Sequence, residues 1–468
     1  MYKNEPFALG KYTPLSVSII AGLVVAVYTI LFGIYRANHA IDTPWFLSFS
    51  YNYCIKGIET DASFGIPFPF GHGGTVAFGK IAAMLQCAVL APFNWSLVAA
   101  NFLSVASVAL AMAAIFALLV GQGFGRLGAV TFCLALAATE PFVAMANQSR
   151  WDYFTFLLAV CGLLLAARQH LLLAGLISAL AIEVQPIGIM APIYLIAHEL
   201  SRMIQTRPFR FEFDRIAKMV LGGGLGLSLY FILHPNILTL VTASPIPAAW
   251  DHSIHFLIPY FFGARLYRHL PELAVFAVCL SIHIWRRDYL QWPFPIIASF
   301  ATFFAGFFVG HANYFYTPFW YFPAFLLVFL TISVRWRAVA LPALVLILFV
   351  PQYAVGYFEA RKYADQDELQ VARSAIARHD ADLRHPHILG DFLFWPVFKD
   401  LSFEWTTSIL RHLQPIPRGT IYLICGLDPP FSPDETACAG VLPTFPGMRL
   451  IEQFSWADRK YLIYERRE

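Results

Sequence analysis

Long apolar segments recur along most of this sequence, and together they predict an integral membrane protein. A helix of about 20 apolar residues crosses the hydrocarbon core of a bilayer. Leu171–Leu200 is too long for one upright helix, and Pro186 interrupts it, so we interpret it as two short spans. The predicted spans are Leu15–Tyr35, Trp95–Val120, Leu127–Ala146, Tyr153–Ala167, Leu171–Leu200 (two), Ile216–His234, Leu273–Trp285, Phe294–Gly310, Phe319–Val334 and Ala338–Tyr357. The pattern predicts an α-helical polytopic membrane protein with about 11 transmembrane helices.

Composition supports this fold class and excludes some functions. Hydrophobic residues make up 58% of the chain and charged residues 13%, whereas soluble domains carry about 25% charge. The net charge of +3 is spread along the chain, so we exclude nucleic acid as a partner. The seven cysteines form no C-x-x-C pair, which disfavours a zinc or iron–sulfur site.

The distribution of Lys and Arg predicts the orientation in the membrane. With the amino terminus in the cytoplasm, the cytoplasmic loops contain more basic residues than the outer loops do, as membrane proteins prefer. This bias requires that Thr75–Pro92 re-enters or lies on the surface within one outer loop, residues 36–94. We therefore expect a transmembrane domain over residues 1–358, with an active site that faces the periplasm of a bacterial inner membrane.

Residues 359–468 are expected to form a small α/β soluble domain on the same outer side. Glu368–His379 has the pattern of an amphipathic helix. Alternation of apolar and polar residues predicts strands, here at Thr420–Gly426, Arg449–Phe454 and Tyr461–Tyr464. Cys425 and Cys438 either form a disulfide in an oxidising compartment or remain free thiols.

Asp42 is the candidate catalytic residue. It follows the first predicted span at its outer end and precedes the aromatic segment Trp45–Tyr53. A carboxylate at the lip of an outer cavity can accept a proton from a hydroxyl group. The alternative is structural, because Asp42-Thr43-Pro44 is also a favourable helix start in which the aspartate caps the helix.

The segment Asn147–Asp152 forms a tight outer turn between two predicted spans. Arg150 is the only cation in that turn, and the planar fork of a guanidinium matches the oxygens of a phosphate group. Arg150 is therefore a candidate phosphate ligand. The alternatives are a simple pair with Asp152 or a side chain that reaches toward lipid headgroups.

Further ionisable residues fall within or near the spans, where such residues are costly and mostly functional. Glu140 and Glu183 serve either a substrate cavity or the packing of helices. No metal-binding spacing such as H-E-x-x-H occurs among the histidines near the outer face, and hydrogen bonding at the interface is the reading we favour for them. The sequence leaves open whether the protein binds a divalent metal, and it specifies no cofactor. The candidate cavity residues are Asp152, Glu183, His72, His255, His311 and Tyr314.

Several of these features together resemble the polytopic GT-C glycosyltransferases, which include protein O-mannosyltransferases and the aminoarabinose transferase of lipid A. Asp42 occupies the place of the acidic residue that follows the first span in that superfamily. The segment Leu173–Gly188 is similar to the "LAGLLLGLAxLTKPTG" stretch of its members, and Thr139–Asp152 resembles their short outer turn. The acidic residue is followed by Thr43 instead of a second acid, and Gln185 replaces the lysine before the proline.

The resemblance implies transfer of a sugar from a polyprenyl-phosphate donor to a hydroxyl of a glycolipid, glycan or protein. Asp42 would act as the general base of an inverting attack. Arg150, with Lys80 and Arg265, would stabilise the departing lipid phosphate. Membrane lipids surround the site.

Two other functional classes are compatible with many spans and a broken helix. A lipid or solute transporter would show two similar halves, which we do not find in the sequence. An enzyme like the O-antigen ligases or polymerases would place its basic residues in a late outer loop, here Pro235–Leu270.

Overall fold

The computed structural model describes most of the helical part and the core of the carboxy-terminal domain. The described residues are 42–57, 78–146, 149–206, 212–235, 266–310, 317–333, 336–337, 339–348, 367–379, 386–405, 420–426, 442–456 and 459–467. The first predicted span, Leu15–Tyr35, and five candidate site residues lie outside these ranges. Those residues are His72, His255, Arg265, His311 and Tyr314.

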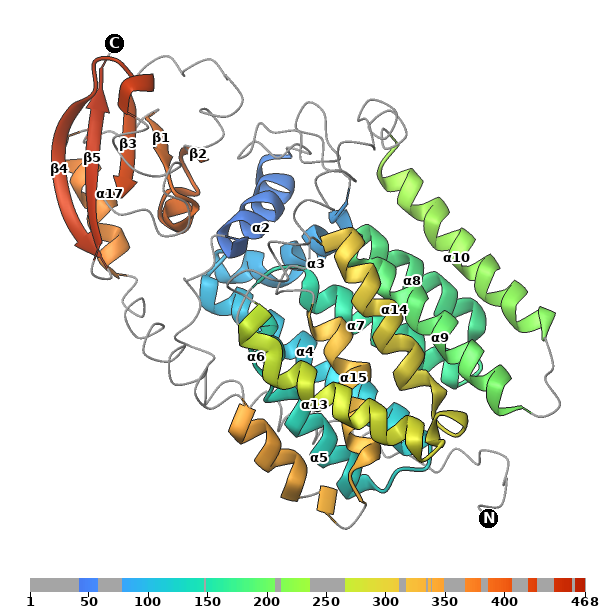
Figure 1. Ribbon diagram of the computed structural model, residues 1–468. Coiled ribbons are helices and arrows are strands. Elements are labelled where there is room, and N and C mark those ends of the chain that lie inside the picture. Colours follow the sequence, from blue (N-terminus) through green and yellow to red (C-terminus); the bar gives the residue numbers. More distant parts are fainter. Residues whose placement is uncertain are drawn as a thin grey trace.

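Helices dominate the part of the chain before residue 350 (Figure 1). They are α2 (Asp42–Tyr51), α3 (Lys80–Leu90), α4 (Leu97–Gly121), α5 (Arg126–Ala137), α6 (Glu140–Ala146), α7 (Asp152–Ala167), α8 (Leu171–Val184), α9 (Met190–Gln205), α10 (Phe213–Leu233), α13 (Leu266–Trp285), α14 (Pro293–Gly310) and α15 (Thr317–Thr331). A shorter apolar helix covers Val339–Leu348. The largest hydrophobic core joins α4 to α7, α9 and α15, with Phe132, Phe156 and Phe322 fully buried.

Several helices are long and apolar enough to cross a membrane. Among the described residues these are Leu97–Gly121, Pro186–Gln205 and Phe213–Leu233. The bent pair of α5 and α6 makes a fourth span if it crosses as one unit. The chain is thus an integral membrane protein, and the expected count of about 11 spans stays a prediction.

The predicted break at Pro186 is confirmed. Helix α8 ends at Val184, a short 3-10 turn covers Pro186–Ile189, and α9 starts at Met190. Proline ends the helix because it lacks a backbone donor and clashes with the preceding turn. Gly188 then lets the chain fold back closely, since a Cβ there would lie 1.9 Å from the carbonyl oxygen of Ala181.

The predicted span Leu127–Ala146 is not one straight helix, and whether it crosses the membrane stays a prediction. The segment forms α5 and α6, which are bent by 70° relative to one another. Pro141 explains the bend, because proline disfavours a helical conformation in the residue before it and cannot continue the hydrogen-bond ladder. Glu140 lies in the first turn of α6.

Helix α3 covers most of the segment that we expected not to cross the membrane. It has 11 residues, which is about 16 Å of helix against a hydrocarbon core of about 30 Å. The 3-10 turn Ala91–Phe93 ends it, and Asn94 and Trp95 follow with positive φ angles of 49° and 56°. A helix this short does not cross a bilayer by itself, and the re-entrant or surface position of the segment stays a prediction.

The carboxy-terminal domain contains one five-stranded mixed sheet with the strand order β2-β1-β3-β5-β4. The strands are β1 (His387–Gly390), β2 (Ser402–Trp405), β3 (Ile421–Gly426), β4 (Arg449–Trp456) and β5 (Arg459–Arg466). Strands β1, β2 and β3 are parallel, whereas β5 is antiparallel to β3 and β4. Helix α17 (Asp367–His379) packs on this sheet through Ala372 and Ile376. The predicted helix and the three predicted strands are confirmed, and β1 and β2 were not expected.

The carboxy-terminal domain contacts α2 and the chain just before α4 (Figure 1). The Tyr51 hydroxyl donates a hydrogen bond of 2.8 Å to Asp400, and its ring lies edge-on to Trp395 with the centroids 5.8 Å apart. Lys399 donates to Asn94. Burial and the carboxylate of Asp400 raise the pKa of Tyr51 to about 12, so the hydroxyl remains a donor at neutral pH. These contacts place the domain on the same side as α2 and α3.

Candidate functional site

The candidate site lies where α2, α3 and the turn before α7 meet. Helix α2 begins at Asp42, as the sequence predicts. The hydroxyl of Thr43, the next residue, accepts a hydrogen bond of 3.2 Å from the backbone N–H of Ser149. Because Ser149 directly precedes Arg150, this bond joins the backbone that carries the candidate base to the backbone that carries the candidate phosphate ligand.

Arg150 is held from two sides. Its Nε lies 2.7 Å from Oδ2 of Asp152, the first residue of α7, and both side chains are buried. The guanidinium lies 5.5 Å from the ring centroid of Phe46 on α2. The pair that the sequence suggested as an alternative therefore forms. Such a pair orients a guanidinium, whose fork carries further donors beyond Nε–H, so the pair and a phosphate contact are compatible.

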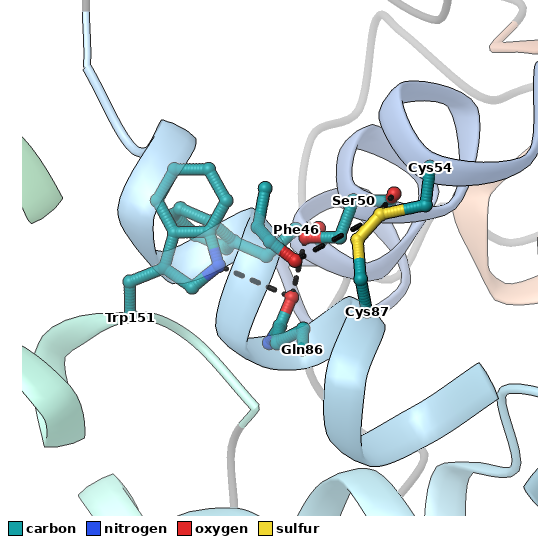
Figure 2. Close-up of a disulfide and its surroundings, with 7 residues drawn as sticks. Phe46, Ser50, Cys54, Gln86, Cys87 and Trp151 are labelled. Carbon is teal, nitrogen blue, oxygen red and sulfur yellow. Dashed lines mark hydrogen bonds between the residues drawn. A yellow bond between two sulfur atoms is a disulfide. The ribbon is translucent and has the colours of Figure 1, made fainter. Parts of the chain in front are cut away.

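Gln86 on α3 connects the three elements (Figure 2). Its Oε1 accepts hydrogen bonds from the Ser50 hydroxyl at 2.5 Å and from the Trp151 indole at 3.2 Å. Its Nε2 lies 3.2 Å from the Tyr153 hydroxyl. Gln86 is 1% exposed, and a buried amide that is satisfied in this way specifies one arrangement of its neighbours. The sequence analysis did not single out Gln86; an amide within an otherwise apolar helix face was the available signal.

A disulfide between Cys54 and Cys87 reinforces the same contact (Figure 2). The two Cα atoms lie 6.1 Å apart, within the usual range for such a bond. It ties the π-helical turn Asn52–Lys56, which continues α2, to the last turn of α3. The sequence analysis did not predict this pair, since both cysteines lie in or beside apolar segments with no spacing that links them. Cys425 is also disulfide-bonded, and its expected partner, Cys438, lies outside the described residues.

Lys80 and Glu183 meet at the start of α3. Lys80 is the first residue of that helix and is 9% exposed. The carboxylate of Glu183, at the end of α8, lies 2.8 Å from the backbone nitrogen of Lys80. Lys80, Arg150, Asp152 and Glu183 thus lie where α2, α3, the start of α7 and the end of α8 meet, and Asp42 is the first residue of α2. Among the described residues, no group of three or more His, Cys, Asp or Glu side chains is arranged to hold a metal ion.

Comparisons with known proteins bear on the fold. No profile of a known protein family matches this chain, and no curated protein matches it either. The crystal structure of ArnT from Cupriavidus metallidurans bound to undecaprenyl phosphate is similar, with a TM-score of 0.55 and 14% sequence identity. The match covers 94% of this chain and 97% of ArnT. This chain has the GT-C fold.

The likeness extends over both parts of the molecule. Because nearly all of ArnT is matched, the GT-C fold of this chain includes the carboxy-terminal domain as well as the helices. The oligosaccharyltransferase of Archaeoglobus fulgidus, in a complex with zinc and sulfate, is a more distant match, with a TM-score of 0.48, 12% identity and coverage of 83% of this chain and 62% of that chain. The match to ArnT confirms, at the level of the fold, the resemblance that short sequence segments suggested.

Proposed function

We propose that this protein is a glycosyltransferase that moves a sugar from a polyprenyl-phosphate donor to a hydroxyl acceptor at the outer face of the membrane. The observation that carries the proposal is the bond between Thr43 and Ser149, because it joins the start of α2, with Asp42, to the turn with Arg150. The GT-C fold supports the same class of reaction. ArnT, which shares the fold, holds undecaprenyl phosphate in its crystal structure. We propose that the present chain binds a lipid phosphate of the same kind.

The proposed reaction is an inverting displacement. Asp42 takes the proton of the acceptor hydroxyl, whose oxygen then forms a bond to the anomeric carbon of the sugar. The bond between that carbon and the phosphate oxygen breaks on the opposite face. The lipid phosphate departs with the electron pair and the negative charge, which Arg150, Lys80 and Arg265 stabilise. Asp152 holds Arg150 in place through their 2.7 Å bond.

We place the site and the carboxy-terminal domain outside the cytoplasm. Disulfides persist in oxidising compartments such as the periplasm, and Cys54, Cys87 and Cys425 are all disulfide-bonded. The free cysteines among the described residues lie instead in α5, α7 and α13. The contact of Lys399 with Asn94 keeps the domain on the side of α2 and α3. The bacterial inner membrane is the compartment that fits these features.

A thiol-labelling experiment tests this orientation. Cysteine in place of Arg449, an exposed residue of β4, should react in intact cells with a maleimide that cannot cross the membrane. Cysteine in place of Gln122 is the matched control, since it is exposed in the turn after α4. That helix has 25 residues and a length of about 37 Å, so its two ends lie on opposite sides. Gln122→Cys should react only after permeabilisation, and the reverse pattern contradicts the orientation.

The contact of Arg150 with a lipid phosphate gives a second test. Arg150→Ala should weaken binding of undecaprenyl phosphate by about 10- to 100-fold, since hydrogen bonds to charged groups contribute about 1.5–3 kcal/mol. Asp152→Ala should weaken binding less, because it removes only the residue that orients the guanidinium. The measurement is the Kd of each purified variant for undecaprenyl phosphate in detergent. Arg168→Ala is the control, because Arg168 is an exposed residue after α7. Equal losses for Arg150→Ala and Asp152→Ala contradict the phosphate contact.

A further inference from the structure

The carboxylate of Glu183 makes an unusual set of contacts for a residue inside a membrane protein. Its Oε1 lies 2.8 Å from the backbone nitrogen of Lys80, and its two oxygens lie 3.4 and 3.3 Å from that of Ile81. The Nε2 atom of His234, at the end of α10, lies 2.9 Å from Oε1. The backbone oxygen of Glu183 also accepts a 2.6 Å hydrogen bond from Gly79. Glu183 is fully buried and His234 is 4% exposed.

These contacts occupy the amino-terminal end of α3. The first backbone N–H groups of a helix have no partner within the helix, and the helix dipole makes that end attractive to an anion. In this protein the anion is a carboxylate of the chain itself. The N–H groups of Lys80 and Ile81 thus bind Glu183, and a ligand phosphate at this site has to be met by side chains.

The opposite side of the same backbone is closed by Trp151. Gly79 has a φ of +90°, and a Cβ on it would lie 1.8 Å from a ring carbon of Trp151. Gly79, the residue before α3, therefore contacts the indole of Trp151 and donates to the backbone oxygen of Glu183, while Lys80 binds the Glu183 carboxylate. Because Trp151 follows Arg150 directly, the place of Lys80 is set relative to Arg150.

We propose that Glu183, supported by His234, is a positioning residue that fixes Lys80 for contact with the donor phosphate. The inference rests on the proposed function, in which Lys80 binds that phosphate. It changes the role that the sequence suggested for Glu183, from a group lining the substrate cavity to one that acts through the backbone of Lys80. His234 extends the arrangement to α10, so α3, α8 and the end of α10 meet at this carboxylate.

The first measurement is structural and needs no substrate. Hydrogen exchange of the protein in lipid nanodiscs, read by mass spectrometry, reports local opening of α3. Peptides that contain Gly79–Leu90 should exchange at least about tenfold faster in Glu183→Ala than in the wild type. Glu183→Gln, which keeps an acceptor oxygen, should retain part of the protection. Unchanged exchange in Glu183→Ala overturns the proposal.

The second measurement asks whether Glu183 acts through Lys80. Lys80→Ala and Glu183→Ala should each raise the Kd for undecaprenyl phosphate by about tenfold or more. The double variant should lie within about threefold of Lys80→Ala, because residues that act through one another are not additive. A double variant whose loss is the product of the two single losses overturns the positioning role.

The control variant is Glu199→Ala. Glu199 is another buried carboxylate, on α9, and it binds Arg202 and Arg215 near the opposite ends of the helices. Its removal should lower thermal stability and leave the Kd for undecaprenyl phosphate unchanged, so a rise like that of Glu183→Ala overturns the proposal. If Glu183→Ala does not fold, Glu183→Gln takes its place in the test. Glu183→Gln should raise the Kd for undecaprenyl phosphate, but less than Lys80→Ala does.

The two hypotheses fail in distinguishable ways. If Lys80→Ala leaves the Kd unchanged, the phosphate contact in the proposed function is wrong, and the positioning role falls with it even if exchange in α3 responds to Glu183→Ala. If Lys80→Ala weakens binding while Glu183→Ala speeds exchange without changing the Kd, only the positioning role is wrong.

Discussion

Replacing Asp42 by asparagine should abolish sugar transfer while the protein remains folded and still binds its lipid donor. General-base assistance contributes about 10²–10⁴-fold to a rate, and an amide cannot take the proton. Asparagine caps a helix about as well as aspartate does, so α2 should still begin at residue 42. The measurement is the turnover of a polyprenyl-phosphate sugar by purified wild type and Asp42→Asn in detergent, together with the Kd for undecaprenyl phosphate.

The matched control is Asp214→Asn, which removes an exposed carboxylate paired with Lys218 on α10. It should leave turnover unchanged. If Asp42→Asn turns over at nearly the wild-type rate, Asp42 serves only as the helix cap. The base would then be sought at Asp152, or at Glu59 and Asp61, which lie outside the described residues.

Gly79→Ala should strongly destabilise the protein, although it adds a single methyl group. The left-handed conformation of this residue costs a side chain about 1–2 kcal/mol, and the Cβ would overlap the ring of Trp151. Overpacking of a tight site adds about 1–3 kcal/mol. The start of α3 must therefore shift away from Glu183, which should both lower the unfolding temperature and weaken binding of undecaprenyl phosphate.

Gly57→Ala separates strain from overlap. Gly57 also has a positive φ, +65°, but a Cβ on it would meet no atom within 4 Å. This variant should show only the conformational cost and should bind the donor normally. Thermal scanning and donor binding, measured side by side, test the prediction. Equal effects of the two variants would mean that the packing of Trp151 on Gly79 has no role.

The positions of the helices could be predicted well because the length of an apolar segment is read from consecutive residues. The break at Pro186 was also predictable, since a proline in the middle of a long apolar segment has one main consequence. Pro141 carries the same chemistry but lies near the end of its segment, where it was read as part of a span that in fact bends by 70°. In the carboxy-terminal domain, β3, β4 and β5 were predicted from alternation, whereas β1 and β2 have four residues each and are too short to show it.

The candidate site was predictable in its residues and not in its connections. Asp42, Arg150 and Asp152 stand out because ionisable groups are rare near membrane spans. The hydrogen bond between Thr43 and Ser149 connects residues that are 106 apart in the sequence. The spacing of apolar residues does not predict such a contact. The same holds for His234 and Glu183, which are 51 residues apart. The pairing of Cys54 with Cys87 depends in turn on how α3 lies against α2.

The contacts of Tyr51 imply an order of events during synthesis. Cys54 and Cys87 are 33 residues apart, whereas Tyr51 and Asp400 are 349 residues apart. A chain made from its amino terminus can therefore oxidise the first pair, and assemble α2 on α3 around Gln86, long before the residues around Asp400 leave the ribosome. The carboxy-terminal domain can then dock on a surface of α2 and α3 that is already assembled.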